Sequence, residues 1–516
     1  MKFILSRPGL PSLPAAAGSS LLLCALVLLS FVHMASGADT PWGGTPVVQP
    51  IIPPDSHGTS QNAFNNLAWQ QFIYLNWVAD PNAPGKPDQS VPASAFGTPL
   101  DQRPVVWESF KEASEVFQPN AAPPSPWGAP RKFPAALRSF PGTAKLKATS
   151  SFGIKGLFAL SKFTGGPNLD LSEFGEAGTG GAWLTAQAKM NNHLTLFEKR
   201  LNEDEFNYIT DKNNLLYDAA NQGPFAKTKG INLPDGSAAF VTYGTVGAIE
   251  IKAAWIELDD STLWPLFKTS KAYVSYPVTG GPPTAPKLVT VGLVGLHIIR
   301  KTPNAQQFVW STFEHVNNAP STADIQNKTL KAWYTYYNAN CDPGTDPYKC
   351  QINHQPVPGT DPYNAPVQVV RTTPISTAGT NPIATLNSST WTTISAVNPN
   401  SVFLNYQLVN VLWPNNNTPT GDPGAQTPLT DGDAQPPQSQ QPVANTTLET
   451  YHQNINCLKC HTNAPVASVG SAAKTIKIGN PAKKQTDPAD SATLASDYSF
   501  LFSEATTPPT KKKPSK

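Results

Sequence analysis

Methionine, cysteine and charged residues are all scarce in this chain of 516 residues. It contains 3 methionines and 5 cysteines, and only 14% of its residues are charged. The formal net charge is +2, so neither nucleic acid nor an anionic membrane is expected as a partner. With few charges but 53 prolines and 35 glycines, the composition indicates many loops and strands and few long exposed helices.

An apolar run stands close to the N-terminus. Two basic residues precede the apolar stretch 21–32, and small residues follow at 35–38. This pattern predicts a secretory signal peptide over residues 1–38, cut after Gly37 or Ala38, and it is too short for a comfortable membrane span. An uncleaved anchor is the alternative. Removal of the signal takes two of the 37 basic residues and none of the 35 acidic ones, and no membrane span is expected in what remains.

The pentapeptide Cys457-Leu-Lys-Cys460-His461 is the most informative motif. Cys-x-x-Cys-His is the attachment signature of a c-type haem. Residues three apart lie on one side of a helical turn, so both thiols reach the vinyl groups on one edge of the porphyrin. His461 then faces the iron as its proximal ligand. The alternatives are a redox-active Cys-x-x-Cys pair, which needs a thioredoxin-like setting, and half of a zinc site, which needs a second Cys/His pair.

The remaining cysteines fit export from the cytoplasm. Cys24 leaves with the predicted signal peptide. Cys341 and Cys350 flank a turn-rich loop, and in an oxidising compartment we expect a disulfide between them. No odd cysteine is left over, and the chain contains a single Cys-x-x-Cys-His motif. We therefore expect one covalent haem c and a periplasmic or secreted location.

The second axial ligand is less well specified. No methionine follows His461, and only Met190 would remain after signal removal, so a His/Met carrier is excluded unless Met190 folds in from far away. His452 stands nine residues before His461. On one continuous helix these residues would be about 13 Å apart along the axis, so His452 is not expected to reach the far side of the iron.

Two histidines lie near the ends of predicted buried strands, His297 and His315. Each is a candidate for the distal ligand or for an acid–base group in a distal pocket, with Glu250 or Glu314 nearby. The alternative for each is an ordinary core histidine. Glu250 and Lys252 share one face of a predicted strand, which is either solvated or directed into a cavity.

The periodicities predict an α+β fold, a large mixed body with antiparallel β-strands and flanking helices. A helix is expected at 61–78, mainly helical structure at 183–221, and a strand hairpin from 288–299 to 308–316. Thr446-x-x-Glu449 fits a capping box, which predicts a C-terminal helix that carries the haem-attachment motif at its end.

The domain organisation follows from composition. After the signal peptide we expect the α+β body at 39–413, a low-complexity linker or loop at 414–444, a haem-attachment segment at 445–505 and a basic, disordered tail at 506–516. A monohaem carrier domain needs only about a hundred residues, so most of the chain has another task.

Several stretches together resemble a family of exported bacterial proteins known only as the cytochrome c family protein. They are FNNLAWQQFIYLNW, VWESFKEASEVF, RLNEDEFNYI, GAIEIKAAW, GLHIIRKTP, FVWSTFEHVNNAP, ETYHQNINCLKCHTNA and DYSFLF. The resemblance covers most of the chain beyond residue 38 and implies covalent haem in the periplasm, but it implies no particular reaction.

The sequence therefore predicts a periplasmic monohaem c-type cytochrome that transfers electrons to or from a redox partner protein or a small molecule. Two alternatives have the same cofactor. One is a haem oxidoreductase acting on peroxide, oxygen or an organic substrate, and the other is a haem-based binding or sensor protein.

Overall fold

The structure is a computed structural model of the chain. It describes residues 43–131, 145–158, 183–276, 284–344, 350–356, 365–377, 382–414, 421–429, 442–467 and 494–509. The predicted signal peptide lies outside the described residues. Within these ranges, no helix combines the length and the apolar character that crossing a bilayer requires.

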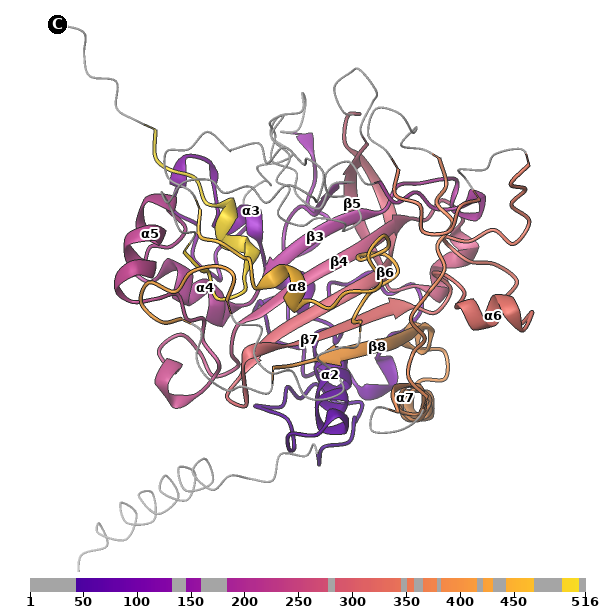
Figure 1. The fold of residues 1–516 in the computed structure, drawn as a ribbon, viewed down its shortest axis with the longest axis horizontal. Coiled ribbons are helices and arrows are strands. Elements are labelled where there is room, and N and C mark those ends of the chain that lie inside the picture. Colours follow the sequence, from indigo (N-terminus) through magenta and orange to yellow (C-terminus); the bar gives the residue numbers. More distant parts are fainter. Residues whose placement is uncertain are drawn as a thin grey trace, which may run out of the picture. The chain divides into compact units, whose positions relative to one another are not determined.

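A sheet of eight strands organises the described residues (Figure 1). The strands are β1 (Lys111–Glu112), β2 (Gly156–Phe158), β3 (Leu196–Leu201), β4 (Ile249–Glu257), β5 (Thr269–Ser275), β6 (Lys287–Thr302), β7 (Ala305–His315) and β8 (Tyr406–Leu412). β4 lies between β3 and β6, while β5 and β7 pair with successive stretches of the other edge of β6. All pairs are antiparallel except β2–β5.

The helices are α2 (Gln61–Leu75), α3 (Ala113–Val116), α4 (Glu203–Thr210), α5 (Ala219–Thr228), α6 (Thr322–Gln326), α7 (Ile383–Val397) and α8 (Leu458–His461). The fold is α+β.

Helix α2 covers one face of the sheet, which we call the α2 face. The ring of Phe72 stacks on Phe313 of β7, with the centroids 4.3 Å apart. The Gln71 amide donates to the Ser311 hydroxyl over 3.1 Å. Ser311 and Phe313 are two apart along the strand, so both side chains point to this face.

The C-terminal segment, residues 442–467, crosses the opposite face, which we call the pocket face (Figure 1). The Asn445 amide donates to the Thr312 hydroxyl over 3.0 Å. The Thr446 hydroxyl donates to the Glu314 carboxylate over 2.6 Å. Thr312 and Glu314 alternate with the residues that α2 contacts, so one strand serves both faces.

Two apolar clusters cover separate parts of the pocket face. One joins Ile299 and Trp310 of the sheet to Leu458 of the C-terminal segment. The other includes Val294 of β6 and Leu448 of the same segment. The C-terminal segment is therefore anchored by apolar contacts at two points, and its residues between Leu448 and Leu458 span the space between the clusters.

Two predictions about the sheet and its helix are confirmed, and one about residues 183–221 is wrong in part. The hairpin exists, since Thr302 at the end of β6 pairs with Ala305 at the start of β7, and α2 matches the helix expected at 61–78. The mainly helical interpretation of 183–221 is wrong at β3, which pairs with β4 along its whole length. The residues of β3 include good helix formers, but pairing within the sheet outweighs that local preference.

The predicted helix leading into the Cys-x-x-Cys-His motif is not formed. Residues 446–456 include several turns and no helix, and α8 is a single turn made by the motif itself. The Glu314 carboxylate accepts the Thr446 backbone N–H over 3.1 Å. Such long-range bonds from side chain to backbone hold the segment in turns where the local pattern favours a helix.

The described part of the predicted linker packs against its surroundings. The Gly424 N–H donates to the Ala226 carbonyl of α5, and the Leu429 N–H donates to the Thr462 carbonyl, each over 2.8 Å. Residues 415–420 and 430–441 of this stretch lie outside the described residues. Residues 421–429 therefore form a packed loop.

Candidate functional site

A pocket lies between the sheet and the C-terminal segment. About 880 Å³ of space between its residues is not filled by protein atoms, and this figure includes solvent at the open mouth. The sheet side includes Lys199, Glu250, Lys252, His297, Ile299, Trp310 and Thr312. The other side includes Glu449, His452, Cys457, Cys460, His461, Phe500 and Leu501. Of the two interpretations of the Glu250 and Lys252 face, the cavity is the one that the structure shows.

The predicted haem-attachment residues lie together on the wall of this pocket. Cys457 and Cys460 are both partly exposed, and neither takes part in a disulfide. The His461 N–H donates to the Cys457 carbonyl over 3.0 Å, which closes the helical turn expected of the motif. Both thiols and the His461 imidazole line the pocket. The three groups that covalent haem attachment needs are thus brought to one place.

The His461 imidazole is oriented by the segment 494–509. Its Nδ1 lies 2.8 Å from the Tyr498 carbonyl oxygen, which only accepts, so Nδ1 carries a proton and donates it. Trp310 and Phe500 flank the ring, with centroids 4.5 and 5.0 Å away. In the neutral ring this tautomer makes Nε2 the basic nitrogen, and metal-bound histidines are commonly held in the same way.

A buried ion pair fixes the turn that carries the Tyr498 carbonyl. Asp497 and Tyr498 have φ angles of +56° and +66°, a left-handed conformation that costs free energy outside glycine. The Asp497 carboxylate accepts from Lys301 Nζ over 2.5 Å and from the Leu233 N–H over 2.7 Å. Because Lys301 belongs to β6, the sheet sets the position of the carbonyl that His461 binds.

His297 projects from β6 into the same pocket. Its Nε2 lies 2.7 Å from Glu449 Oε1, and Glu449 Oε2 accepts the Asn445 N–H over 2.7 Å. Burial raises the pKa of the Glu449 carboxyl group, but the neighbouring His297 and the Asn445 N–H outweigh it and lower the pKa overall. Glu449 is therefore a carboxylate that holds His297 in one orientation.

His315, the other candidate, lies outside the pocket. Its ring stacks on Phe267 with the centroids 4.1 Å apart. Its Nε2 donates to the Leu266 carbonyl over 3.0 Å, and its Nδ1 accepts the Asn317 N–H over 3.1 Å. Burial lowers the pKa of His315 to about 3. These are the surroundings of a core histidine, so of the two candidates only His297 reaches the pocket.

His452 lines the pocket, contrary to the expectation from the sequence. That expectation depended on a continuous helix up to His461, and turns replace the helix. His452 is only five residues from Cys457 in the sequence. This short separation was the one signal that could have identified His452 as a candidate iron ligand. Met190 lies in the apolar cluster around Leu448, and no methionine is among the described residues that line the pocket.

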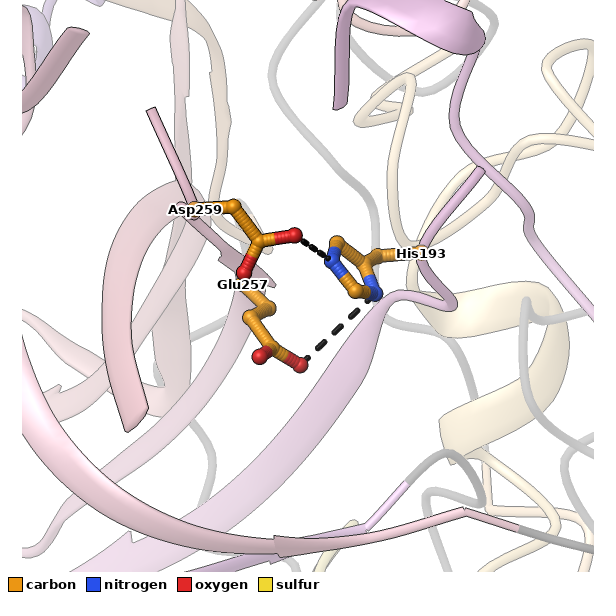
Figure 2. Close-up of side chains that lie close together, drawn as sticks. All are labelled: His193, Glu257 and Asp259. Carbon is orange, nitrogen blue, oxygen red and sulfur yellow. Dashed lines mark hydrogen bonds and ion pairs between the residues drawn. The ribbon is translucent and has the colours of Figure 1, made fainter. Parts of the chain in front are cut away.

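His193 lies between two carboxylates at the end of β4 and just beyond it (Figure 2). Its Nε2 is 2.7 Å from Asp259 Oδ2, and its Nδ1 is 3.6 Å from Glu257 Oε2. The Tyr276 hydroxyl donates to the same Glu257 oxygen over 2.5 Å. Among the described residues this is the one group of metal-ligating side chains close together. The carboxylates face different ring nitrogens, which suits a hydrogen-bonded tie better than ligands that share one ion.

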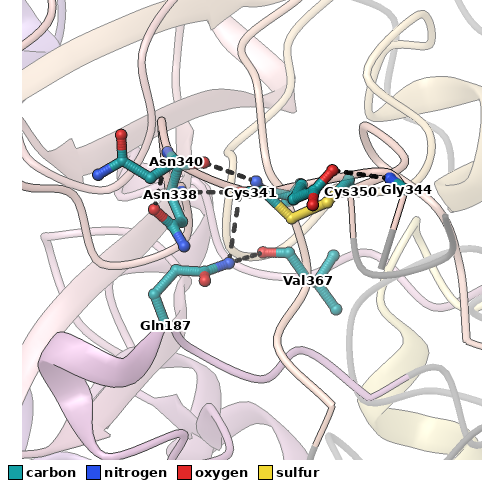
Figure 3. The surroundings of a disulfide bond; sticks show 9 residues. Gln187, Asn338, Asn340, Cys341, Gly344, Cys350 and Val367 are labelled. Carbon is teal, nitrogen blue, oxygen red and sulfur yellow. Dashed lines mark hydrogen bonds between the residues drawn. A yellow bond between two sulfur atoms is a disulfide. The ribbon is translucent and has the colours of Figure 1, made fainter. Parts of the chain in front are cut away.

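The predicted disulfide is present. Cys341 and Cys350 are bonded, with their Cα atoms 5.6 Å apart (Figure 3). The Cys341 N–H donates to the Asn338 carbonyl over 3.2 Å, and the Gly344 N–H donates to the Asp342 carboxylate over 2.8 Å. Disulfides of this kind form and persist mainly in oxidising compartments.

Comparisons with known proteins do not assign the chain to a family. No family model matches it, and no curated protein or solved structure is significantly similar to it. The resemblance to exported cytochromes therefore stays a prediction, and function has to be inferred from the pocket.

Proposed function

We propose that this chain is an exported monohaem c-type cytochrome that transfers electrons. In this proposal Cys457 and Cys460 attach the haem, and His461 is the proximal iron ligand. One observation carries it: two thiols and an imidazole with a bonded Nδ1 line one pocket. A periplasmic location accords with the disulfide between Cys341 and Cys350.

The side chains around the pocket suit a haem. Ile299, Trp310 and Phe500 offer apolar surface to a macrocycle, and Lys252 and Lys199, which is paired with Glu504, bring positive charge to the pocket. A covalently bound haem supplies reversible one-electron exchange at its iron. The chain contributes attachment, orientation of the proximal imidazole and apolar walls that limit the access of water.

Electron transfer is favoured over the two alternatives by the ligand types in the pocket. A haem oxidoreductase or a gas sensor keeps one axial position of the iron open, whereas a carrier is usually six-coordinate. Two imidazoles besides His461 line the pocket, those of His297 and His452. Because two further nitrogen ligands are at hand, a six-coordinate iron is favoured. The large α+β body would then dock a redox partner protein or a small donor or acceptor.

Covalent attachment is tested first. The full chain, with its N-terminal segment, is expressed in a bacterium that makes c-type cytochromes, and haem is detected on a denaturing gel. We expect covalent haem in the native chain and none in the Cys457→Ala/Cys460→Ala variant. The matched control is Cys341→Ala/Cys350→Ala, which removes the other cysteine pair and should keep the haem. Covalent haem in the first variant, or none in the native chain, would overturn the proposal.

The optical spectrum of the reduced protein, with and without carbon monoxide, then separates the carrier from its alternatives. A carrier with a six-coordinate iron should show a low-spin spectrum that carbon monoxide does not change. A high-spin spectrum that shifts on addition of carbon monoxide would favour the oxidoreductase or the sensor instead.

A further inference from the structure

Three imidazoles line the pocket, and they differ in what already holds them. His461 is bonded to the Tyr498 carbonyl, and His297 is bonded to Glu449. The His452 ring is partly exposed and has no hydrogen bond to any residue that the structure describes. Of His297 and His452, the two imidazoles left for a second ligand, only the His452 ring therefore has no hydrogen-bonded partner to give up among the described residues.

The partner of His297 makes that residue a poor iron ligand. Its Nε2, the usual ligand nitrogen, is bonded to Glu449, and the Glu449 side chain is only 14% exposed. A buried charged acceptor that loses its hydrogen-bond donor costs about 1 to 3 kcal/mol or more. Ligation by His297 through Nε2 would impose this cost, and ligation by His452 would not.

The fold fixes the backbone on both sides of His452 while its ring stays unbound. The Tyr451 hydroxyl donates to the Trp183 carbonyl, and the Gln453 amide donates to the Val370 carbonyl over 3.0 Å. The His452 N–H itself donates to the Glu449 carbonyl over 3.0 Å. A ligand residue on a backbone that is already ordered loses little entropy on binding, so the site is prepared in advance.

We propose that His452 would supply the second imidazole ligand of the haem iron, and that His297 is a positioning residue that holds Glu449 and the C-terminal segment against the sheet. This inference rests on the proposed function. It names two imidazoles, His452 and His461, as the ligand pair of a low-spin carrier. Such an iron lacks the methionine ligand that raises the reduction potential of many small cytochromes, so a lower potential is expected.

The test compares three single variants of the full chain, each purified with its haem: His452→Ala, His297→Ala and, as a control outside the pocket, His193→Ala. Optical and electron paramagnetic resonance spectra report the spin state, and a denaturing gel reports covalent haem. His452→Ala should keep covalent haem, become high-spin and bind carbon monoxide. Added imidazole should then restore the low-spin spectrum. His297→Ala and His193→Ala should stay low-spin.

The outcomes separate this inference from the proposed function. If the native chain holds covalent haem and His452→Ala stays low-spin, the assignment of His452 is overturned while the proposed function stands. A switch to high spin in His297→Ala alone would also overturn it and make His297 the ligand. A native chain with covalent high-spin haem overturns the six-coordinate ligand pair. Absence of covalent haem from the native chain defeats the proposed function itself.

Discussion

The two faces of the sheet bury polar groups in different ways. On the α2 face, Lys155 Nζ lies 2.7 Å from Glu108 and 2.9 Å from Glu198, and it stands 4.0 Å above the ring of Trp255. These charges satisfy one another inside the fold. On the pocket face, His297 and Glu449 are bonded to each other, but they line an open pocket beside His452. Buried charges that are all paired with one another are typical of a group that stabilises the fold. An imidazole without a hydrogen-bonded partner, such as His452, is typical of a binding site.

Along one strand, alternate side chains point to the α2 face and to the pocket face. On β7, the side chains of Ser311 and Phe313 contact α2, whereas the Trp310 ring lies beside His461 and the Thr312 hydroxyl accepts from Asn445 on the pocket face. Because successive side chains of a strand point to opposite faces, neighbouring positions should respond differently to mutation. Substitutions on the α2 face should change the free energy of unfolding, and substitutions on the pocket face should change the optical spectrum of the haem that we propose for the pocket.

The largest effect is expected from Phe72→Ala. The Phe72 ring packs against Trp69, Phe313, Phe403 and Tyr406 on the α2 face, and its removal leaves a cavity that rigid aromatic neighbours cannot fill. We expect a loss of about 4 kcal/mol in the free energy of unfolding, measured by urea denaturation. Phe72→Leu should lose less than half as much, and the haem spectrum of the folded protein should not change. A spectral change would mean that the two faces are coupled.

The next effect is expected from Lys155→Met. Burial raises the pKa values of Glu108 and Glu198, but Lys155 and other nearby cations outweigh it, and both pKa values are lowered. The variant leaves two buried carboxylates short of a cation, which should cost about 3 kcal/mol at neutral pH. The control is Lys189→Met, which removes one partner of the exposed Lys189–Asp260 ion pair (3.6 Å) and should cost less than about 1 kcal/mol.

The pH dependence of the Lys155→Met variant gives a second check. A carboxyl group with a lowered pKa in the folded state contributes stability above its unfolded pKa, and this stability is lost as the pH falls through the folded value. Without Lys155 the two pKa values should rise toward the unfolded value. The variant should therefore lose less stability than the native protein on acidification from pH 7, as followed by urea denaturation. An equal loss would show that Lys155 does not stabilise the ionised forms.

A smaller effect of pH is expected from His315. Burial lowers its pKa to about 3 in the folded protein, so its contribution to stability is complete above about 6.5, the unfolded value, and is lost as the pH falls below that. Between pH 6.5 and pH 5 this loss should amount to about 2 kcal/mol. His315→Gln keeps a donor for the Leu266 carbonyl but takes up no proton. Urea denaturation at both pH values should show a flatter profile in the variant, and an unchanged profile would mean that the imidazole is accessible to protons.

The sequence predicted those parts of the fold in which the local pattern and the sheet agree. The hairpin of β6 and β7 was readable because an apolar strand, a turn and a second strand follow one another directly. The alternation along β4 was readable too, but a sequence does not tell whether the Glu250 and Lys252 face meets water or a cavity. The C-terminal segment, 442–467, lies across this face and makes it the wall of a pocket, although it is far away in the sequence.

The helix predicted before the Cys-x-x-Cys-His motif does not form, for a related reason. Thr446-x-x-Glu449 has the spacing of a capping box, yet the Glu449 carboxylate binds the N–H of Asn445 and the ring of His297. The Gln453 amide binds the Val370 carbonyl as well. These partners lie far away in sequence, so a local pattern cannot reveal them. The expectation that His452 would not reach the iron depended on the same helix, so it is wrong for the same reason.

The smallest loss of stability is expected from Gly295→Ala, at the contact between the pocket face and the C-terminal segment. Gly295 of β6 lies under the C-terminal segment, and a Cβ there would stand 2.2 Å from the Thr447 hydroxyl oxygen and 3.0 Å from the Asn445 side-chain oxygen. Gly295→Ala should therefore lift the segment, at a cost of about 1 to 2 kcal/mol in stability. Because this segment leads to His452 and the two thiols, the haem spectrum should change with it, unlike in the α2-face variants.

The matched control for Gly295→Ala is Gly128→Ala, in a turn, where a Cβ would meet nothing within 4 Å, so stability should change by less than about 0.5 kcal/mol. The double variant Gly295→Ala/Thr447→Ala removes the nearest clashing atom, so it should recover part of the lost stability and move the spectrum back toward that of the native protein. If Gly295→Ala changes neither property, the C-terminal segment does not sit on β6 as described, and the pocket face loses the wall on which the ligand assignment depends.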